Sequence, residues 1–363
     1  MSALNIDIQL LTDYLNLQNE RPLFMPMWEP SLVPAANLRQ QKNGNRRLLA
    51  CDVEPSGLIE NAELIYGNLA SLKGDFPFAF HAGGGNQWLE AICGCEIYVS
   101  GGSIWAKPPP DDSLQKFLER DVDAEWIKTL NECHYEMVKW AEGKAFCALP
   151  VIHGPLDILV AHVGVMEISY AMYEEPDLLM CALNKATDIC VDITHNLASM
   201  LKPESGGYAS RMHIYTPKPC TTVQNDASYM MSPENFKKYL EPLEKRIVSC
   251  VPNSVYHMHN TSLHNLETIA SLGCCAVQIS VDPNGPHINE QIKIYEEIKK
   301  RVPLVLSCWT LETLEYLNNS LTPSGLALTL TPSPEHTQLD ENGRYAGFDE
   351  WNYAYSTLTS RYF

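Results

Sequence analysis

Short apolar runs alternate along the chain with longer segments in which apolar residues recur at helical spacing. This alternation is typical of βα units and of a parallel sheet. It is most regular in the second half of the chain, and the first half contains three further apolar runs. The predicted strands span residues 22–28, 76–82, 146–153, 220–226, 254–260, 276–282, 302–308 and 326–332. Because eight strands close a (β/α)₈ barrel, we predict an α/β fold of the TIM-barrel type.

Three segments fall outside this regular pattern. Residues 1–20 have the spacing of an amphipathic helix, which we expect to form an N-terminal extension of the barrel. Within residues 96–105, two β-rich runs flank a Ser-Gly-Gly-Ser stretch and predict an inserted hairpin outside the barrel. Residues 201–219 form a connector rich in Gly and Pro, and a connector of this length is often functional, for example as a lid. Since no linker or repeat divides the chain, residues 1–363 are expected to form a single decorated domain.

Composition and charge narrow the class of protein. The chain is 45% hydrophobic, enough for a buried core, and no apolar run approaches the roughly 18–20 residues of a membrane helix. The N-terminus lacks the basic stretch of a signal peptide, so we predict a cytoplasmic protein with no membrane partner. The net charge of -18 repels a phosphate backbone and argues against nucleic acid as a partner. Twelve scattered cysteines without a secretion signal predict free thiols or ligands rather than disulfides.

Titratable side chains gather at the carboxyl ends of the predicted strands, whereas the strand interiors are apolar. In a barrel, catalytic residues project from these ends. The residues concerned are His81, His153, Asp226, His257, His259, Asp282, Cys308 and, just past the last strand, His336. This asymmetry predicts an active site for a small-molecule substrate at that end of the barrel.

His257 and His259 are the leading candidates for metal ligands. Residues i and i+2 of a strand point to the same face, so the two imidazoles converge if that face is the barrel mouth. His336 and Cys308 are the candidates to complete the ligand set. Two alternatives stand beside this interpretation. Both histidines can instead be partly buried and bonded to backbone groups, and Cys308 also suits a small position in the core.

Other polar residues are candidates for catalysis or substrate binding. Asp226 and Asp282 would supply oxygen ligands or orient the imidazoles. Arg211, in the connector, can reach a carboxylate or phosphate with two hydrogen bonds. His81 precedes three glycines and a predicted helix, an arrangement that either cradles an anion or simply makes a tight turn. For His81 and His153 taken singly, a structural role is the alternative.

Three ordered segments carry a resemblance to a known family. The segment beginning VIHGPLDILV has the strand and Gly-Pro turn of that family's third unit, here with Gly154 and Pro155. VQNDASYMMSPENFKKYLEPLEKRI is similar to its strand, Asp and Ser-Pro-Glu helix, with matches at Asp226, Ser232, Pro233 and Glu234. SVYHMHNTSLHNLETIASLGCCAVQIS resembles the strand and polar terminus that follow. The family is the uroporphyrinogen decarboxylase superfamily, which includes corrinoid-dependent methyltransferases. The resemblance covers roughly residues 146–336, more loosely 76–105, and implies a TIM barrel.

The resemblance has implications for the site. The decarboxylase grips porphyrin carboxylates with an arginine-rich segment after its first strand, and this chain has MWEPSLVPAANLRQQ there, with Glu29 and no arginine before Arg39. The methyltransferases hold zinc with a His-x-Cys pair on one strand and a Cys after the last strand. Here His257 matches the His, His259 stands at the Cys position, and His336 lies near the place of the last Cys. An ion held by more imidazoles is a harder Lewis acid than thiolate-bound zinc.

These observations lead to three hypotheses. The first is a metal-assisted, methyltransferase-like enzyme that uses zinc or another divalent transition metal and a corrinoid protein as partner. The second is a metal-free decarboxylase or lyase acting on a carboxylated tetrapyrrole or small acid, with acid/base side chains. The third is a non-catalytic corrinoid- or tetrapyrrole-binding protein. The predicted catalytic residues are Asp226, His257 and His259; the predicted substrate-binding residues are His81, His153, Arg211 and Asp282; and the metal candidates are His257, His259, His336 and Cys308.

Overall fold

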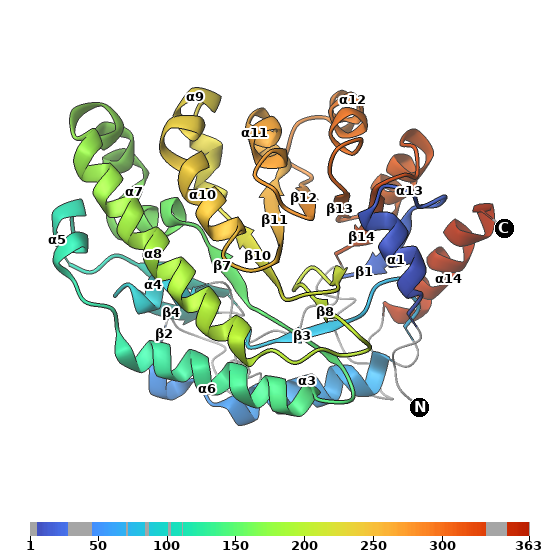
Figure 1. Cartoon of the computed structure of the whole chain (residues 1–363), viewed down its shortest axis with the longest axis horizontal. Coiled ribbons are helices and arrows are strands. Elements are labelled where there is room, and N and C mark those ends of the chain that lie inside the picture. The colour runs from blue at the N-terminus through green and yellow to red at the C-terminus, as the bar shows by residue number, and fades with distance from the viewer. Residues whose placement is uncertain are drawn as a thin grey trace.

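The core of the fold is a parallel sheet of seven strands in the order β1-β14-β13-β12-β11-β10-β7. A separate parallel ladder joins β3 to β6, and helices lie around the outer side of the strands (Figure 1). All eight predicted strands are present, because β6 and β7 are two halves of the predicted strand 146–153. This computed structural model describes residues 6–27, 46–69, 72–83, 87–100, 103–110, 112–331 and 347–362.

Strands and helices alternate along the chain as the hydrophobic pattern predicts. The strands are β1 (Leu23–Pro26), β2 (Arg46–Leu48), β3 (Ala79–His81), β4 (Glu96–Ser100), β5 (Ser103–Lys107), β6 (Phe146–Ala148), β7 (Val151–His153), β8 (Tyr208–Ala209), β9 (Tyr215–Thr216), β10 (Cys220–Gln224), β11 (Asn253–His259), β12 (Ala276–Val281), β13 (Leu304–Cys308) and β14 (Leu326–Leu330). The α-helices are α1 (Ile8–Leu15), α3 (Pro55–Leu69), α4 (Trp88–Ile92), α5 (Leu114–Glu119), α6 (Ala124–Ala141), α7 (Pro155–Glu174), α8 (Pro176–Met200), α9 (Pro233–Asn235), α10 (Glu241–Val248), α11 (Leu266–Ala270), α12 (Ile288–Ile298), α13 (Leu311–Ser320) and α14 (Phe348–Thr359). Within the described ranges no ladder joins β1 to β3. The α/β arrangement is therefore TIM-like, and full closure of the barrel stays a prediction.

The two predicted additions to the barrel are both present. The N-terminal helix is α1, which begins after Asp7, whose carboxylate accepts a hydrogen bond from the backbone of Leu10 at 3.0 Å. The inserted hairpin consists of β4 and β5, paired antiparallel. A third strand, β2, pairs antiparallel with β4 and was not predicted. It comprises only Arg-Arg-Leu, and three residues with one apolar side chain give no alternating signal.

The connector 201–219 lies at the amino ends of the strands, opposite to the strand ends that carry the candidate site. The backbone N–H of Ala79, the first residue of β3, donates to His213 Nδ1 at 3.0 Å. The N–H of Asn253, the first residue of β11, donates to the carbonyl of Pro219 at 3.1 Å. The idea of a lid over the mouth is therefore wrong. The long helix α8 returns the chain to the amino ends before the connector begins.

A buried ion pair joins the first strand to the last helix. Asp75, in the loop before β3, accepts two hydrogen bonds from the Arg21 guanidinium, at 2.8 and 2.7 Å. The same carboxylate accepts from the backbone N–H of Phe24 in β1 at 2.8 Å and from the hydroxyl of Tyr355 in α14 at 2.7 Å. Only 4% of the Asp75 side chain and 14% of the Arg21 side chain are exposed. One carboxylate therefore connects three segments that are far apart in the sequence.

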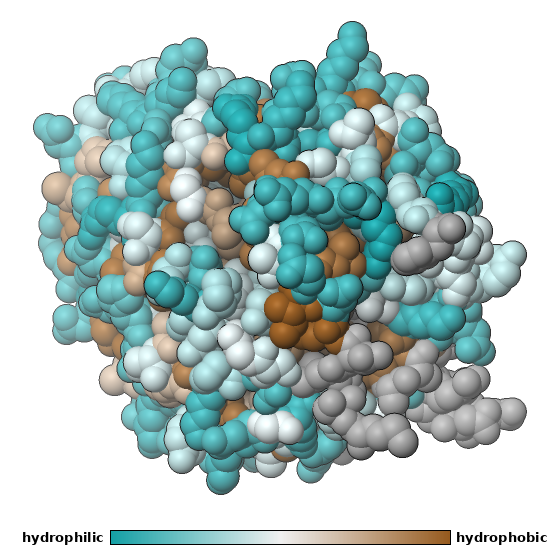
Figure 2. All heavy atoms as spheres, turned by 45° about the vertical axis from the view of Figure 1, so that its right-hand side comes forward, coloured by the Kyte–Doolittle hydropathy of each residue, from teal (hydrophilic) through white to brown (hydrophobic). Residues whose placement is uncertain are grey.

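Apolar residues reach the surface in places. On the face that Figure 2 shows, hydrophobic residues gather near the centre, and hydrophilic residues lie directly above them. In the described part of the chain, α7 is long and apolar enough to cross a membrane by length and composition alone, although its sequence had not suggested a membrane helix. Gly164, with φ 83° and ψ 161°, interrupts its helical backbone. All twelve cysteines are free thiols, as their scatter along the sequence predicts.

Candidate functional site

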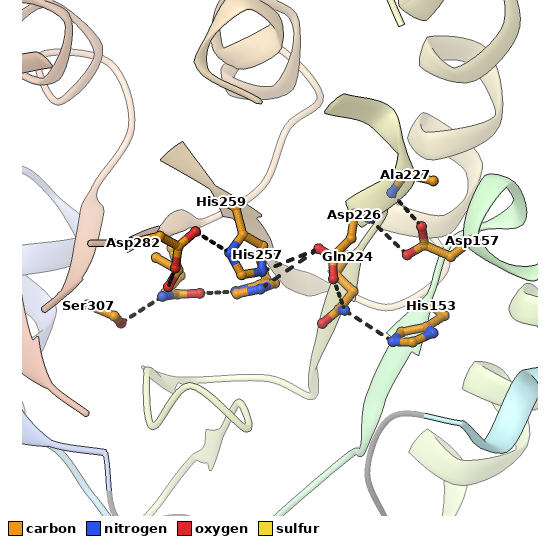
Figure 3. Close-up of polar contacts among 11 residues, drawn as sticks. His153, Asp157, Gln224, Asp226, Ala227, His257, His259, Asp282 and Ser307 are labelled. Atoms are coloured by element: carbon orange, nitrogen blue, oxygen red, sulfur yellow. Dashed lines mark hydrogen bonds and ion pairs between the residues drawn. The ribbon is translucent and has the colours of Figure 1, made fainter. Parts of the chain in front are cut away.

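Asp226, His257 and His259 meet at the carboxyl ends of β10 and β11 (Figure 3). The two histidines lie two residues apart on β11 with ring centroids 5.1 Å apart, and Asp226 opens a short 3-10 turn that follows β10. Asp226 Oδ1 lies 4.0 Å from His257 Nε2 and 3.8 Å from His259 Nε2. One atom from each side chain can therefore serve as a ligand, and these atoms lie within 4.8 Å of one another.

A hydrogen bond on the far side of each ring orients the two imidazoles. His259 Nδ1 lies 2.6 Å from Asp282 Oδ2. Because a carboxylate only accepts, the His259 proton sits on Nδ1 and the lone pair on Nε2 is free. His257 Nδ1 bonds to Oε1 of Gln278, whose amide nitrogen donates to the Ser307 hydroxyl at 2.6 Å. This partner gives His257 the same tautomer, so both Nε2 lone pairs face Asp226 (Figure 3).

The three facing groups form a site that suits a cation. Asp226 Oδ1 is buried and has no hydrogen-bond partner, although it is an acceptor facing two further acceptors. Burial lowers the pKa of His257 more than the charge of Asp226 raises it, and the neutral imidazole is the form that binds metals. Two imidazoles and a carboxylate are ligands for zinc or another divalent transition metal, and metal-binding histidines commonly have their other ring N–H bonded. The residues present therefore fit such an ion.

A row of polar side chains extends the site across four strands. Neighbouring strands place one polar residue each at the same level of the sheet: His153 on β7, Gln224 on β10, His257 on β11 and Gln278 on β12. The Gln224 amide nitrogen donates to Asp226 Oδ2 at 2.9 Å and lies 3.1 Å from His153 Nε2. Because Gln224 holds the second oxygen of Asp226, the first oxygen stays turned toward the histidines.

His153 and Asp282, both predicted to bind substrate, form hydrogen bonds with protein side chains. His153 is buried and its Nδ1 bonds to the carboxylate of Glu90 in α4. Burial lowers the pKa of His153, but the charge and hydrogen bond of Glu90 raise it more, and the resulting pKa is about 9. Asp282 contacts His259, as described above. Asp282 thus orients His259, and His153 contacts Gln224, which bonds to Asp226. Direct contact of either residue with a substrate stays a prediction.

The charge of Arg211 acts on both His81 and His257. His81 ends β3, is 3% exposed, and its Nδ1 has no hydrogen-bond partner. Burial lowers the pKa of His81, and the positive charge of Arg211 lowers it further. Arg211 also contributes to the lowered pKa of His257, so its guanidinium is near enough to affect both rings. Arg211 thus approaches the site from the connector at the other end of the strands.

Cys308 does not reach the cluster, which corrects its assignment as a metal candidate. Ser307 faces the site through its hydrogen bond with Gln278. The next residue of a strand points to the opposite face, so Cys308 faces the surrounding helices. It is fully buried, and its Sγ lies 3.8 Å from the carbonyl of Leu306. The alternative of a small core residue is the one that the structure favours. His336, Glu29, Arg39 and the glycines at 84 and 85 lie outside the described residues.

Sequence reasoning missed the side chains that hold the cluster in place. Gln224 and Gln278 lie inside apolar strands, and a single glutamine there forms no motif. A usable signal did exist, since each is a polar residue in a buried strand next to the strand of His257. Glu90 lies in a five-residue helix, and only the fold brings it to His153.

The turn that carries Asp226 depends on a buried acid in α10. Asn225 donates a hydrogen bond from Nδ2 to Oε1 of Glu244, which is fully buried. Burial raises the pKa of Glu244 to about 8, although the hydrogen bond from Asn225 lowers it in part. Glu244 therefore holds a proton in the folded protein at pH values where it is ionised in the unfolded chain.

This proton makes stability depend on pH. Since the folded state binds the proton more tightly, its contribution is complete below the ordinary glutamate pKa and is lost as pH rises through about 8. In urea unfolding between about pH 5 and pH 8, the wild-type protein should lose roughly 1.4 kcal/mol per pH unit relative to Glu244→Gln. Parallel pH profiles for the two proteins would show that Glu244 is not the group responsible.

Comparison with known proteins bears on the fold. No family model and no curated protein matches this chain. Among solved structures, it is similar to a methyltransferase from Methanosarcina mazei, with 14% sequence identity, 99% of each chain covered and a TM-score of 0.64. A B12-independent methionine synthase from a Shewanella species is similar over 64% of this chain and 67% of its own, with 8% identity and a TM-score of 0.43. The first likeness shows a shared fold along the whole chain. The protein is thus a TIM-like α/β protein with a His-His-Asp cluster at the carboxyl ends of its strands.

Proposed function

We propose that this protein is a metal-assisted methyltransferase whose ion is held by Asp226, His257 and His259. One observation carries the proposal. A buried carboxylate oxygen without a hydrogen-bond partner faces two imidazole nitrogens whose lone pairs are free. Three acceptors in this arrangement repel one another unless a cation lies among them. Zinc or another divalent transition metal suits this ligand set, and His336 is retained as the proposed fourth ligand.

Residues around the cluster orient the two proposed histidine ligands. A bound divalent ion would supply Lewis acidity, which favours the deprotonated form of an acceptor group. Asp282 and Gln278 keep the protons of the two histidines on Nδ1 and so leave Nε2 free. With His336 as a fourth ligand, the methyl acceptor would take a fifth position, because catalytic zinc sites can become five-coordinate.

The proposed acceptor is a small molecule with an anionic group. Arg211 brings a positive charge near His81 and His257, and the buried Nδ1 of His81 has no protein partner. Together they would offer a positive charge and a hydrogen-bonding atom to an anionic acceptor, within a protein whose net charge is -18. The proposed methyl donor is a methylated corrinoid carried by a partner protein, as the resemblance over residues 146–336 implies.

Two measurements on the purified protein test this proposal. Elemental analysis should find a transition metal at a stoichiometric level. With methylcobalamin as donor and a panel of small anionic molecules as acceptors, demethylation of the corrinoid should be detectable by its absorbance. His257→Ala should reduce both signals. The absence of a stoichiometric ion, together with activity that His257→Ala leaves unchanged, would contradict the proposal.

A metal-free lyase is the second candidate, because the same three groups can share a proton instead of a metal. Asp226 lies 3.8 Å from His259 Nε2, a distance at which a protonated imidazole pairs with a carboxylate. Release of carbon dioxide from a carboxylated pyrrole by metal-free protein, and its loss on Asp226→Asn, would support this candidate. Tight tetrapyrrole binding without any turnover would instead favour a binding protein.

A further inference from the structure

Reciprocal hydrogen bonds join the first turn of α7, which follows β7, to the turn that follows β10. Asp157, in the first turn of α7, accepts from the backbone N–H groups of Asp226 at 2.9 Å and Ala227 at 2.7 Å, one on each carboxylate oxygen (Figure 3). In the other direction, the N–H of Asp157 donates to Asn225 Oδ1 at 3.1 Å. Asp157 therefore caps the 3-10 turn that follows β10, and Asn225 caps the start of α7.

The two turns are packed closely against each other at Gly154. The N–H of Gly154 donates to the carbonyl of Gln224 at 2.6 Å. A Cβ atom at Gly154 would lie 2.5 Å from Nδ2 of Asn225, too close for any side chain. Asn225 is in turn fixed by its hydrogen bond to the buried Glu244. The loop of β10 thus has little room to shift relative to α7.

We propose that Asp157 is the positioning residue of the site, fixing the backbone from which Asp226 reaches the two histidines. The inference rests on the proposed function, because it concerns the placement of one proposed ligand. The Asp226 side chain is 43% exposed, so packing alone does not hold it. Gln224 fixes one carboxylate oxygen, but only while the backbone of residue 226 stays in place. Two backbone N–H groups, one bonded to each oxygen of the Asp157 carboxyl group, supply that constraint.

Cobalt binding by the full-length protein tests this role. Co²⁺ replaces zinc at many sites, and its visible absorption reports the geometry of its ligands. Removal of a residue that orients a metal ligand typically costs 10- to 100-fold in metal affinity. We expect Asp157→Ala to raise the Kd for Co²⁺ by about 10- to 100-fold and to change the visible spectrum. Asp157→Asn keeps one accepting oxygen and should fall between this variant and wild type.

Asp177 offers a matched control, since it is an exposed acid in the first turn of α8, directly after a proline. Asp177→Asn should leave the Kd and the spectrum of bound Co²⁺ unchanged. Amide hydrogen exchange without metal provides a second reading, in which the N–H groups of Asp226 and Ala227 should exchange faster in Asp157→Asn. If Asp157→Ala does not fold, Asp157→Asn carries the test with both readings.

The outcomes separate this inference from the proposed function. If wild type binds no Co²⁺, the proposed function fails and the positioning role fails with it. If wild type binds Co²⁺ and Asp157→Asn binds it with the same Kd and spectrum, the ligand site stands and the inference is wrong. Weaker binding in Asp157→Asn together with faster exchange at residues 226 and 227 supports it.

Discussion

Replacement of His259 by alanine is expected to weaken metal binding by about two to three orders of magnitude. Structural zinc sites in small peptides bind the ion with about 10–16 kcal/mol, so each of four ligands contributes about 2.5–4 kcal/mol. Since about 1.4 kcal/mol corresponds to a tenfold change, the loss of one ligand raises the Kd by about 10²- to 10³-fold. Competition with a chromogenic chelator measures this change directly, and methyl transfer should fall together with metal occupancy.

Two further variants grade the effect. Asp282→Asn leaves the imidazole of His259 in place but removes the charge behind its Nδ1, so a smaller loss of about 10- to 100-fold is expected. His264 lies outside the cluster and bonds to the carbonyl of Met231 at 2.9 Å, so His264→Ala should leave the Kd unchanged. Equal metal affinity in wild type, Asp282→Asn and His259→Ala would show that the ion, if present, binds elsewhere.

The location of the site could be predicted because it follows from simple periodicities. Alternating apolar and helical segments indicated parallel strands, and parallel strands bring their carboxyl ends to one edge. The spacing of His257 and His259 then placed both rings on one face of β11. Asp226 joined them because its own strand lies beside theirs. None of these steps required knowledge of side-chain packing.

The exact composition of the site could not be predicted, because it depends on which face of each strand turns inward. Ser307 and Cys308 are neighbours at the end of β13, and a strand sends them to opposite faces. The sequence left Cys308 open between a metal ligand and a small core residue, whereas the pairing of β13 with β12 turns the serine toward Gln278. Likewise, nothing local in α7 shows that Asp157 faces the turn after β10, since that contact joins residues about 70 positions apart.

The position of the connector illustrates a second limit. Its length and glycine content suggested a loop over the active site. Such properties do not indicate the end of the sheet at which a loop lies, because that depends on the helix before it. The 25-residue α8 runs back along the sheet and delivers the connector to the amino ends. Arg211 still approaches the site, but it does so from the opposite end of the strands.

Loss of the Asp75 carboxylate is expected to be among the most destabilising single changes in the protein. Asp75→Ala leaves the buried Arg21 guanidinium without its counter-ion, and it also removes the acceptor for the Phe24 N–H and the Tyr355 hydroxyl. Breaking a buried ion pair by deleting one partner costs about 3–5 kcal/mol. The free energy of unfolding, measured with urea at neutral pH, should fall by about that amount.

Variants elsewhere separate this effect from a general loss of charge. Tyr355→Phe removes one of the four donors to Asp75, so a loss of about 1 kcal/mol is expected. Glu297→Gln breaks an ion pair with Lys300 in which both side chains are exposed, and the unfolding midpoint should not move measurably. Asp75 bonds to the N–H of Phe24 near the start of β1, whereas the candidate ligands lie at the carboxyl ends of the strands. The folded fraction of Asp75→Ala should therefore bind Co²⁺ as wild type does. A protein that unfolds at the wild-type midpoint without this carboxylate would mean that β1 and α14 are held together by apolar packing alone.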